Sequence, residues 1–166
     1  MMIDIVFCPN PRTDLSFHKV LNAKQFHIVE GLSEENNRKS VENKQVDILI
    51  APERAGKKDR FTQRDSGLNH VLCVLAREND VAIGFSFSDL LNSSHRYILL
   101  GRMLQNVRLC RKYKVRMVVA SFAKDPWEMR SAHDLLAFAL VLGMAPKEAK
   151  QALHFQKKKK LVKIIK

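Results

Sequence analysis

The strongest constraint on the fold of this 166-residue chain is a repeated alternation of short apolar runs with amphipathic stretches. Runs typical of strands cover residues 3–7, 26–29, 46–50, 81–85 and 115–120. Stretches with helical periodicity or helix-start signals cover residues 33–43, 66–75, 96–113, 131–142 and 146–155. Because strand and helix alternate regularly, the sequence predicts a single α/β domain over residues 1–156, with a largely parallel sheet.

Capping residues and prolines predict where several helices and strands begin or end. We expect Ser66 to cap the helix that follows it, Ser131 and Asp134 to form a capping box, and Pro146 to begin the last helix. Residues 85–88 (Phe-Ser-Phe-Ser) alternate as a strand end does, which indicates core positions followed by a cap. The polar stretch 52–65 is predicted to be a surface loop, and Trp127 to be a loop anchor or a contact to a partner.

Positive charge is concentrated in the last third of the chain. Residues 1–100 contain 13 basic and 13 acidic side chains, whereas residues 101–166 contain 16 basic and 4 acidic ones. Six basic residues lie between Arg102 and Arg116, mostly on the predicted solvent side of a helix, and six lysines lie in the tail 157–166. Such a field attracts polyanions. The simpler alternative is a solvated helix face and a solubility tail.

Cysteine usage and hydropathy indicate a cytoplasmic protein without a membrane role. Cys8, Cys73 and Cys110 lie in apolar runs and form no CxxC pair, as expected of free thiols in a reducing compartment. No signal-peptide pattern is visible, and no apolar run approaches the ~18 residues that a spanning helix needs.

The sequence offers little support for an enzyme acting alone. The six histidines form neither HxH nor HExxH, so no metal site is predicted. No GxSxG, P-loop or GxGxxG pattern is present, so we predict no catalytic residue and no cofactor bound by this chain. His133 and Asp134 are adjacent, but Asp134 already has a capping role.

Binding of nucleic acid is better supported. Most aromatic residues lie inside apolar runs, which favours recognition of phosphates and shape in folded RNA over base stacking. Arginine grips a phosphate with two donors, and lysine acts as a point charge. The predicted phosphate contacts are Arg96, Arg102, Arg108, Arg111, Lys112 and Arg130 in the body and Lys157, Lys158, Lys159 and Lys160 in the tail. For Arg130, pairing with a carboxylate is an equal alternative.

Two stretches resemble a known family. Residues 64–91 (RDSGLNHVLCVLARENDVAIGFSFSDLL) and residues 106–144 (NVRLCRKYKVRMVVASFAKDPWEMRSAHDLLAFALVLGM) are similar to archaeal ribonuclease P protein component 3, a p30-type subunit. This family belongs to the polymerase-and-histidinol-phosphatase barrel superfamily. The resemblance implies a TIM-like (β/α) barrel, and it adds Arg64 and His70 as candidate RNA contacts, although a capped helix start explains His70 equally well.

The resemblance also implies a function. It implies a noncatalytic subunit of the ribonucleoprotein that removes 5′ leaders from precursor tRNA, where the RNA subunit with magnesium performs the cleavage. The implied partners are the ribonuclease P RNA, protein component 2 in a two-plus-two assembly, and precursor tRNA indirectly. The alternative is a standalone metal-dependent phosphoesterase of the same superfamily. That alternative is weakened because the first strand, Asp4 to Cys8, contains no histidine.

The chain is short for a complete (β/α) barrel. A full barrel usually needs about 200 residues or more, whereas the predicted domain has five clear strands. We therefore expect an abbreviated barrel that closes incompletely, in which residues 17–21 or 161–165 supply an extra element.

Overall fold

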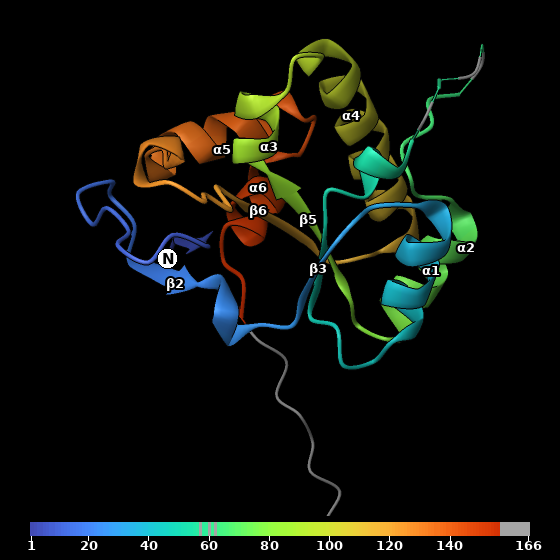
Figure 1. Ribbon diagram of the computed structural model, residues 1–166, viewed down its shortest axis with the longest axis horizontal. Coiled ribbons are helices and arrows are strands. Elements are labelled where there is room, and N and C mark those ends of the chain that lie inside the picture. Colours follow the sequence, from blue (N-terminus) through green and yellow to red (C-terminus); the bar gives the residue numbers. More distant parts are fainter. Residues whose placement is uncertain (57, 60, 62, 157–166) are drawn as a thin grey trace, which may run out of the picture.

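The computed structural model describes residues 1–56, 58–59, 61 and 63–156, and it has the predicted α/β architecture (Figure 1). The strands are β1 (Ile3–Val6), β2 (Lys19–Asn22), β3 (Ile28–Glu30), β4 (Ile48–Ile50), β5 (Ala82–Ser86) and β6 (Met117–Ala120). The helices are α1 (Glu34–Glu42), α2 (His70–Glu78), α3 (Phe87–Asn92), α4 (Arg96–Tyr113), α5 (Ala132–Val141) and α6 (Pro146–Ala152). Three 3₁₀ turns, η1 (Ala23–Gln25), η2 (Pro52–Ala55) and η3 (Pro126–Glu128), lie between them.

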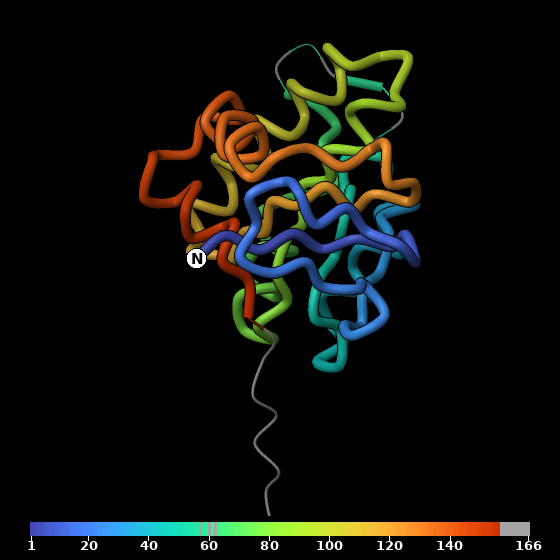
Figure 2. The backbone as a smooth tube through the Cα atoms, turned by 90° about the vertical axis from the view of Figure 1, so that its left-hand side faces the viewer, coloured from blue at the N-terminus to red at the C-terminus, as the bar shows by residue number. Residues whose placement is uncertain are grey.

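All strand pairs in the described residues are parallel, and they form two sheets. One sheet has the order β3-β4-β5-β6, and the other is the pair β1-β2. The sheets meet just beyond the end of β6, because Phe122 N–H donates to Ile5 O over 2.9 Å and Phe7 N–H donates to Ala123 O over 2.8 Å. Figure 2 shows the two blue strands running side by side next to the orange stretch that follows β6. The strand order β2-β1-β6-β5-β4-β3 is that of an abbreviated, open TIM-like barrel.

The strand side chains point alternately to two cores, as barrel strands do. Outward residues such as Leu49, Ile83 and Val119 are buried against the helices. Inward residues such as Ile50 and Val118 pack with β1 and Phe122 in the barrel interior. Gly84 also faces the interior, where a Cβ would lie 2.6 Å from Cγ2 of Ile50. A larger residue would therefore displace the Ile50 side chain.

Buried Asp4 joins β1 to the residue that follows β6. Its carboxylate accepts hydrogen bonds from the backbone N–H and the hydroxyl of Ser121, both over 2.7 Å. Burial raises the pKa of Asp4 to about 6, against the lowering effect of these hydrogen bonds. Asp4, in the first strand, therefore has a structural contact that stabilises the junction of the two sheets.

Most predicted element positions are confirmed. β2 supplies an extra strand over residues 19–22, as expected for the stretch 17–21, whereas residues 161–165 lie outside the described part of the chain. The Ser131–Asp134 capping box, Pro146 at the start of α6 and Ser86 as the cap of α3 are present. Two predictions are wrong. Asn69, and not Ser66, caps α2. Trp127 is 79 % exposed and is therefore no loop anchor packed on the body, whereas the alternative, a contact to a partner, stays a prediction.

Candidate nucleic-acid interface

The candidate interface is the exposed side of α4. The helix buries Met103, Val107 and Cys110 against the sheet and α2, which leaves the opposite side to solvent. Arg108 and Lys112 lie there at i and i+4, so they are neighbours on the helix surface. Neither forms an ion pair with a described residue, and the Nζ of Lys112 lies 5.4 Å from the centroid of the Tyr113 ring.

Arg64 extends this row of cations from outside the helix. Its guanidinium lies directly over Gly101, where an added Cβ would be 2.5 Å from Cζ of Arg64. The Gln105 side chain holds the same segment, because it accepts from Arg64 N–H over 3.2 Å and donates to Arg64 O over 2.9 Å. Positions 101, 105, 108 and 112 share one side of α4, within about 16 Å of helix length. We call Arg64, Arg108 and Lys112 the α4 stripe.

Arg102 occupies a different environment from the one predicted. It is buried, with a relative exposure of 8 %, and does not lie on the solvent side of α4. Its guanidinium donates to Asp59 Oδ1 over 2.8 Å and to the carbonyls of Gly56 over 2.7 Å and Glu53 over 3.2 Å. The prediction of an exposed Arg102 is therefore wrong. The Arg102 guanidinium provides hydrogen-bond donors for loop carbonyls that would otherwise be buried without a partner.

The other predicted contacts are scattered or already engaged. Arg111 forms a two-donor ion pair with Glu148 over 2.9 and 2.7 Å, and this contact lowers the pKa of the Glu148 carboxyl. Arg96 is exposed at the other end of α4 and donates to Leu91 O. His70 is the exposed first residue of α2. Lys157, Lys158, Lys159 and Lys160 lie outside the described residues.

Arg130 pairs with no carboxylate among the described residues, and its predicted phosphate contact stays a prediction. Its Nη1 donates to the carbonyls of Trp127 and Met129, both over 2.8 Å. The guanidinium carbon lies 5.6 Å from the centroid of the Phe87 ring. Arg130 is thus held by backbone carbonyls and an aromatic ring, and it is separate from the α4 stripe.

The loop that Arg102 holds contains a fully buried carboxyl group. Glu53 lies in η2, where Asn106 Nδ2 donates to its Oε2 over 3.3 Å and its Oε1 has no partner among the described residues. Burial raises the pKa of Glu53 to about 8. The predicted surface loop 52–65 is therefore partly wrong, because Pro52 and Glu53 are core positions.

We expect Glu53→Gln to remove a pH dependence of stability. Between the unfolded pKa of 4.5 and the folded pKa of about 8 the native state binds one proton more than the unfolded state. The unfolding free energy of the wild type then falls by up to about 1.4 kcal/mol per pH unit as the pH rises through this window. Urea unfolding at about pH 6.5 and about pH 8 checks this, because Asp4, with a pKa of about 6, contributes little there. If the unfolding free energy changed equally with pH in the wild type and in Glu53→Gln, burial of the Glu53 carboxyl would not raise its pKa as stated.

Among the described residues, no group of three or more His, Cys, Asp or Glu side chains is placed to hold a metal ion. The helices of the described segments are also all too short or too polar to span a bilayer. All three cysteines are free and buried.

Sequence reasoning missed the basic and polar residues beyond the end of α4. Lys114 ends the helix in a left-handed conformation with φ 58°, and Arg116 precedes β6 with Nε 2.8 Å from Asp80 Oδ1. Gln151 and His154 of the α6 region lie near them around a hollow. The only sequence signal was the continuation of the basic run from Arg111 to Arg116.

Comparisons with known proteins agree on one family. The sequence model of the family described as RNase P subunit p30 matches residues 8–162. Ribonuclease P protein component 3 of Methanosarcina acetivorans is 41 % identical over 137 residues, which cover 81 % of this chain and 54 % of that protein. The Thermococcus kodakarensis protein of the same name is 35 % identical, with coverages of 82 % and 60 %. The chain spans about half the length of the curated relatives it matches.

A solved structure shares the fold. A chain in the cryo-EM structure of archaeal ribonuclease P with mature tRNA superposes with a TM-score of 0.66 at 33 % sequence identity. The superposition covers 79 % of this chain and 55 % of the other. The α4 stripe and the hollow near α6 both lie within the residues matched by the family model.

Proposed function

The chain belongs to the RNase P subunit p30 family, and from this membership we propose that it is a protein subunit of ribonuclease P. In this role it supports the RNA subunit during removal of 5′ leaders from precursor tRNA and performs no chemistry itself. Cleavage belongs to the RNA subunit with its magnesium. Catalysis is thus a property of the complex.

The structural observation that supports RNA binding in this role is the α4 stripe. Arg108 and Lys112 are exposed and form no ion pair with a described residue. The Arg64 side chain is half exposed, and its Nη1 lies 3.5 Å from Asp59 Oδ2. Exposed cations in a row neutralise successive phosphates and release counterions, without needing a particular base sequence. This arrangement suits a protein that holds a folded RNA by its backbone.

The proposed partners follow from the same membership. They are the ribonuclease P RNA, protein component 2 in a two-plus-two assembly, and precursor tRNA indirectly. We propose a cytoplasmic location, which is compatible with three free and buried thiols.

The test is reconstitution of precursor-tRNA cleavage from the cognate RNA and component 2, with and without this chain. We expect the chain to raise the cleavage rate when magnesium is present. No gain in rate would remove the assignment. Cleavage by the chain alone with added metal would instead favour the standalone phosphoesterase.

A further inference from the structure

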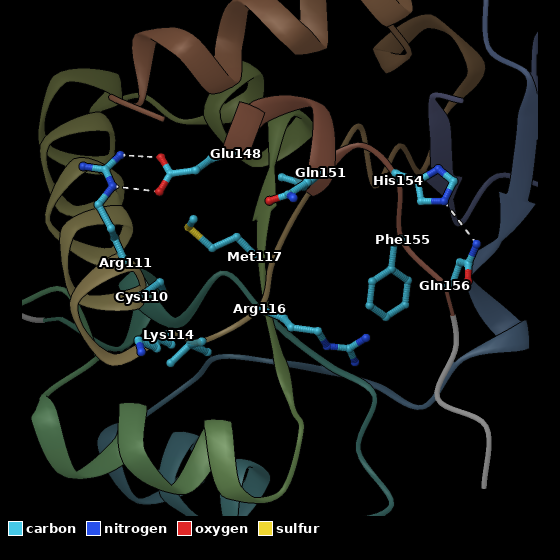
Figure 3. Close-up of a pocket in the computed structure, with 12 residues that line it drawn as sticks. Cys110, Arg111, Lys114, Arg116, Met117, Glu148, Gln151, His154, Phe155 and Gln156 are labelled. Atoms are coloured by element: carbon cyan, nitrogen blue, oxygen red, sulfur yellow. Dashed lines mark hydrogen bonds and ion pairs between the residues drawn. The ribbon is translucent and has the colours of Figure 1, made fainter. Parts of the chain in front are cut away.

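A hollow of about 500 Å³ lies between the end of α4, the start of β6 and α6, and its lining residues Arg111 and Lys114 flank Lys112 of the α4 stripe (Figure 3). It opens at the amino end of β6, the opposite end from the one at which barrel enzymes hold their active sites. A second hollow of about 590 Å³ adjoins it and shares Gln151 and His154. Volumes in this range accommodate one small organic ligand each. We call the first of these the α6 hollow.

The α6 hollow has a small surplus of free positive charge. Arg111 and Arg116 on its rim are paired with Glu148 and Asp80, whereas exposed Lys114 has no ion-pair partner among the described residues. The adjoining hollow adds exposed Lys147 and Lys150, which are likewise unpaired with described residues. The charge is therefore enough for one phosphate in the α6 hollow and a neighbouring phosphate outside it.

The remaining lining suits a planar, partly apolar group. Val115, Met117 and Ala152 contribute apolar surface. The Arg116 guanidinium lies 5.2 Å from the centroid of the Phe155 ring, and Figure 3 shows it extending across the hollow toward that ring. Guanidinium planes are a common stacking surface for unpaired RNA bases.

Of the polar side chains that line the α6 hollow, some are already hydrogen-bonded and others are free to bind a ligand. His154 is engaged, because its Nδ1 must donate to the Met1 carbonyl over 3.0 Å and its Nε2 then accepts from Gln156 over 3.1 Å. The Gln151 carboxamide has no hydrogen-bond partner among the described residues. A carboxamide offers both a donor and an acceptor, as the edge of a base requires.

We propose that the α6 hollow binds a single unpaired nucleotide of RNA. The base stacks beside Arg116 with its edge on Gln151, the nucleotide's phosphate lies at Lys114, and the next phosphate lies near Lys147 and Lys150. An acidic peptide fits less well, because its carboxylates could meet Lys114, Lys147 and Lys150 but would leave the stacking surface of Arg116 and the carboxamide of Gln151 without a base. This inference rests on the proposed function, since it assigns the α6 hollow to the same RNA.

The test compares two RNA hairpins that differ only in one bulged nucleotide. We expect the wild-type chain to bind the bulged hairpin about tenfold more tightly, as a base that is both stacked and hydrogen-bonded should allow. Gln151→Ala should reduce this preference, because only the stacking beside Arg116 then remains, and it should leave the affinity for the fully paired hairpin unchanged. Lys114→Gly should reduce the preference without loss of thermal stability, because glycine tolerates the left-handed φ of 58°. Lys24→Gln, on η1, is the matched control and should keep the preference.

Any one of the following results would overturn the proposal: equal affinities of the wild type for both hairpins, an undiminished preference in Gln151→Ala, or competition by a glutamate-rich peptide stronger than by the bulged hairpin. Tight binding of a free nucleoside 5′-monophosphate without any bulge preference would also overturn it, in favour of a free-nucleotide site. Failure of the proposed function looks different, because the bulge preference would then persist while the chain failed to stimulate precursor-tRNA cleavage.

Discussion

Replacing Arg102 by methionine is expected to lower the free energy of unfolding by about 2 kcal/mol, the usual cost of leaving buried acceptors without their donor, because Arg102 is buried whereas its ion-pair partner Asp59 is partly exposed. The substitution leaves Asp59 without its 2.8 Å partner and the carbonyls of Glu53 and Gly56 without donors. The aliphatic part of the side chain is retained, so the loss reports mainly the polar contacts. Urea unfolding followed by circular dichroism measures it.

Arg108→Met is the matched control for this prediction, because it makes the same change on the exposed side of the same helix. We expect it to change stability by less than about 0.5 kcal/mol. Arg102→Lys should fall between the two, since lysine keeps the charge but cannot reach three acceptors with a planar fork. Equal stabilities of Arg102→Met and Arg108→Met would show that the guanidinium does not hold the loop.

Neutralising the α4 stripe is expected to have the largest effect on RNA binding. In the double variant Arg108→Gln with Lys112→Gln, two phosphate contacts are lost. The slope of log affinity against log salt should then become shallower by about 1.8 for duplex RNA, at about 0.9 per contact. At ~0.1 M salt the same relation gives a loss of affinity on the order of 50-fold. Filter binding or fluorescence anisotropy over a salt series measures both quantities.

The control variant removes two exposed lysines far from α4. Lys19 and Lys24 lie on β2 and η1, at the opposite side of the molecule from α4 (Figure 1). Lys19→Gln with Lys24→Gln changes the net charge by the same amount, so a general field effect would appear equally in both double variants. An unchanged slope in the α4 variant, or an equal change in both, would contradict a localised phosphate contact.

Periodicity and capping residues predicted the architecture because they act over a few residues. The alternation of apolar runs gave the parallel α/β fold, and Ser131 with Asp134 gave the start of α5. The cap of α2 was misplaced by three residues, because Ser66 and Asn69 are both good caps. Ser66 is buried beside α4, where its hydroxyl accepts from Gln105 over 2.9 Å. Only tertiary structure decides between two such residues.

The candidate interface was only partly predictable, because contacts between distant residues decide which cations are free. The basic run in α4 identified the right helix. Arg102 and Arg108 look equivalent in it, yet Arg102 meets Asp59, 43 residues earlier in the chain. Arg64 joins the stripe because residue 101 is glycine, a contact that no local pattern encodes. The α6 hollow likewise depends on how α6 packs against β6.

The most direct test of the account is the concentration dependence of reconstituted precursor-tRNA cleavage. The cognate RNA and component 2 are held constant while the wild type, the Arg108→Gln and Lys112→Gln variant, or the Lys19→Gln and Lys24→Gln control is titrated. We expect the wild type and the control to give the same curve. The α4 variant should reach the same maximal rate only at a concentration on the order of 50-fold higher. Superimposable curves for all three proteins would contradict the claim that this chain holds the RNA through α4.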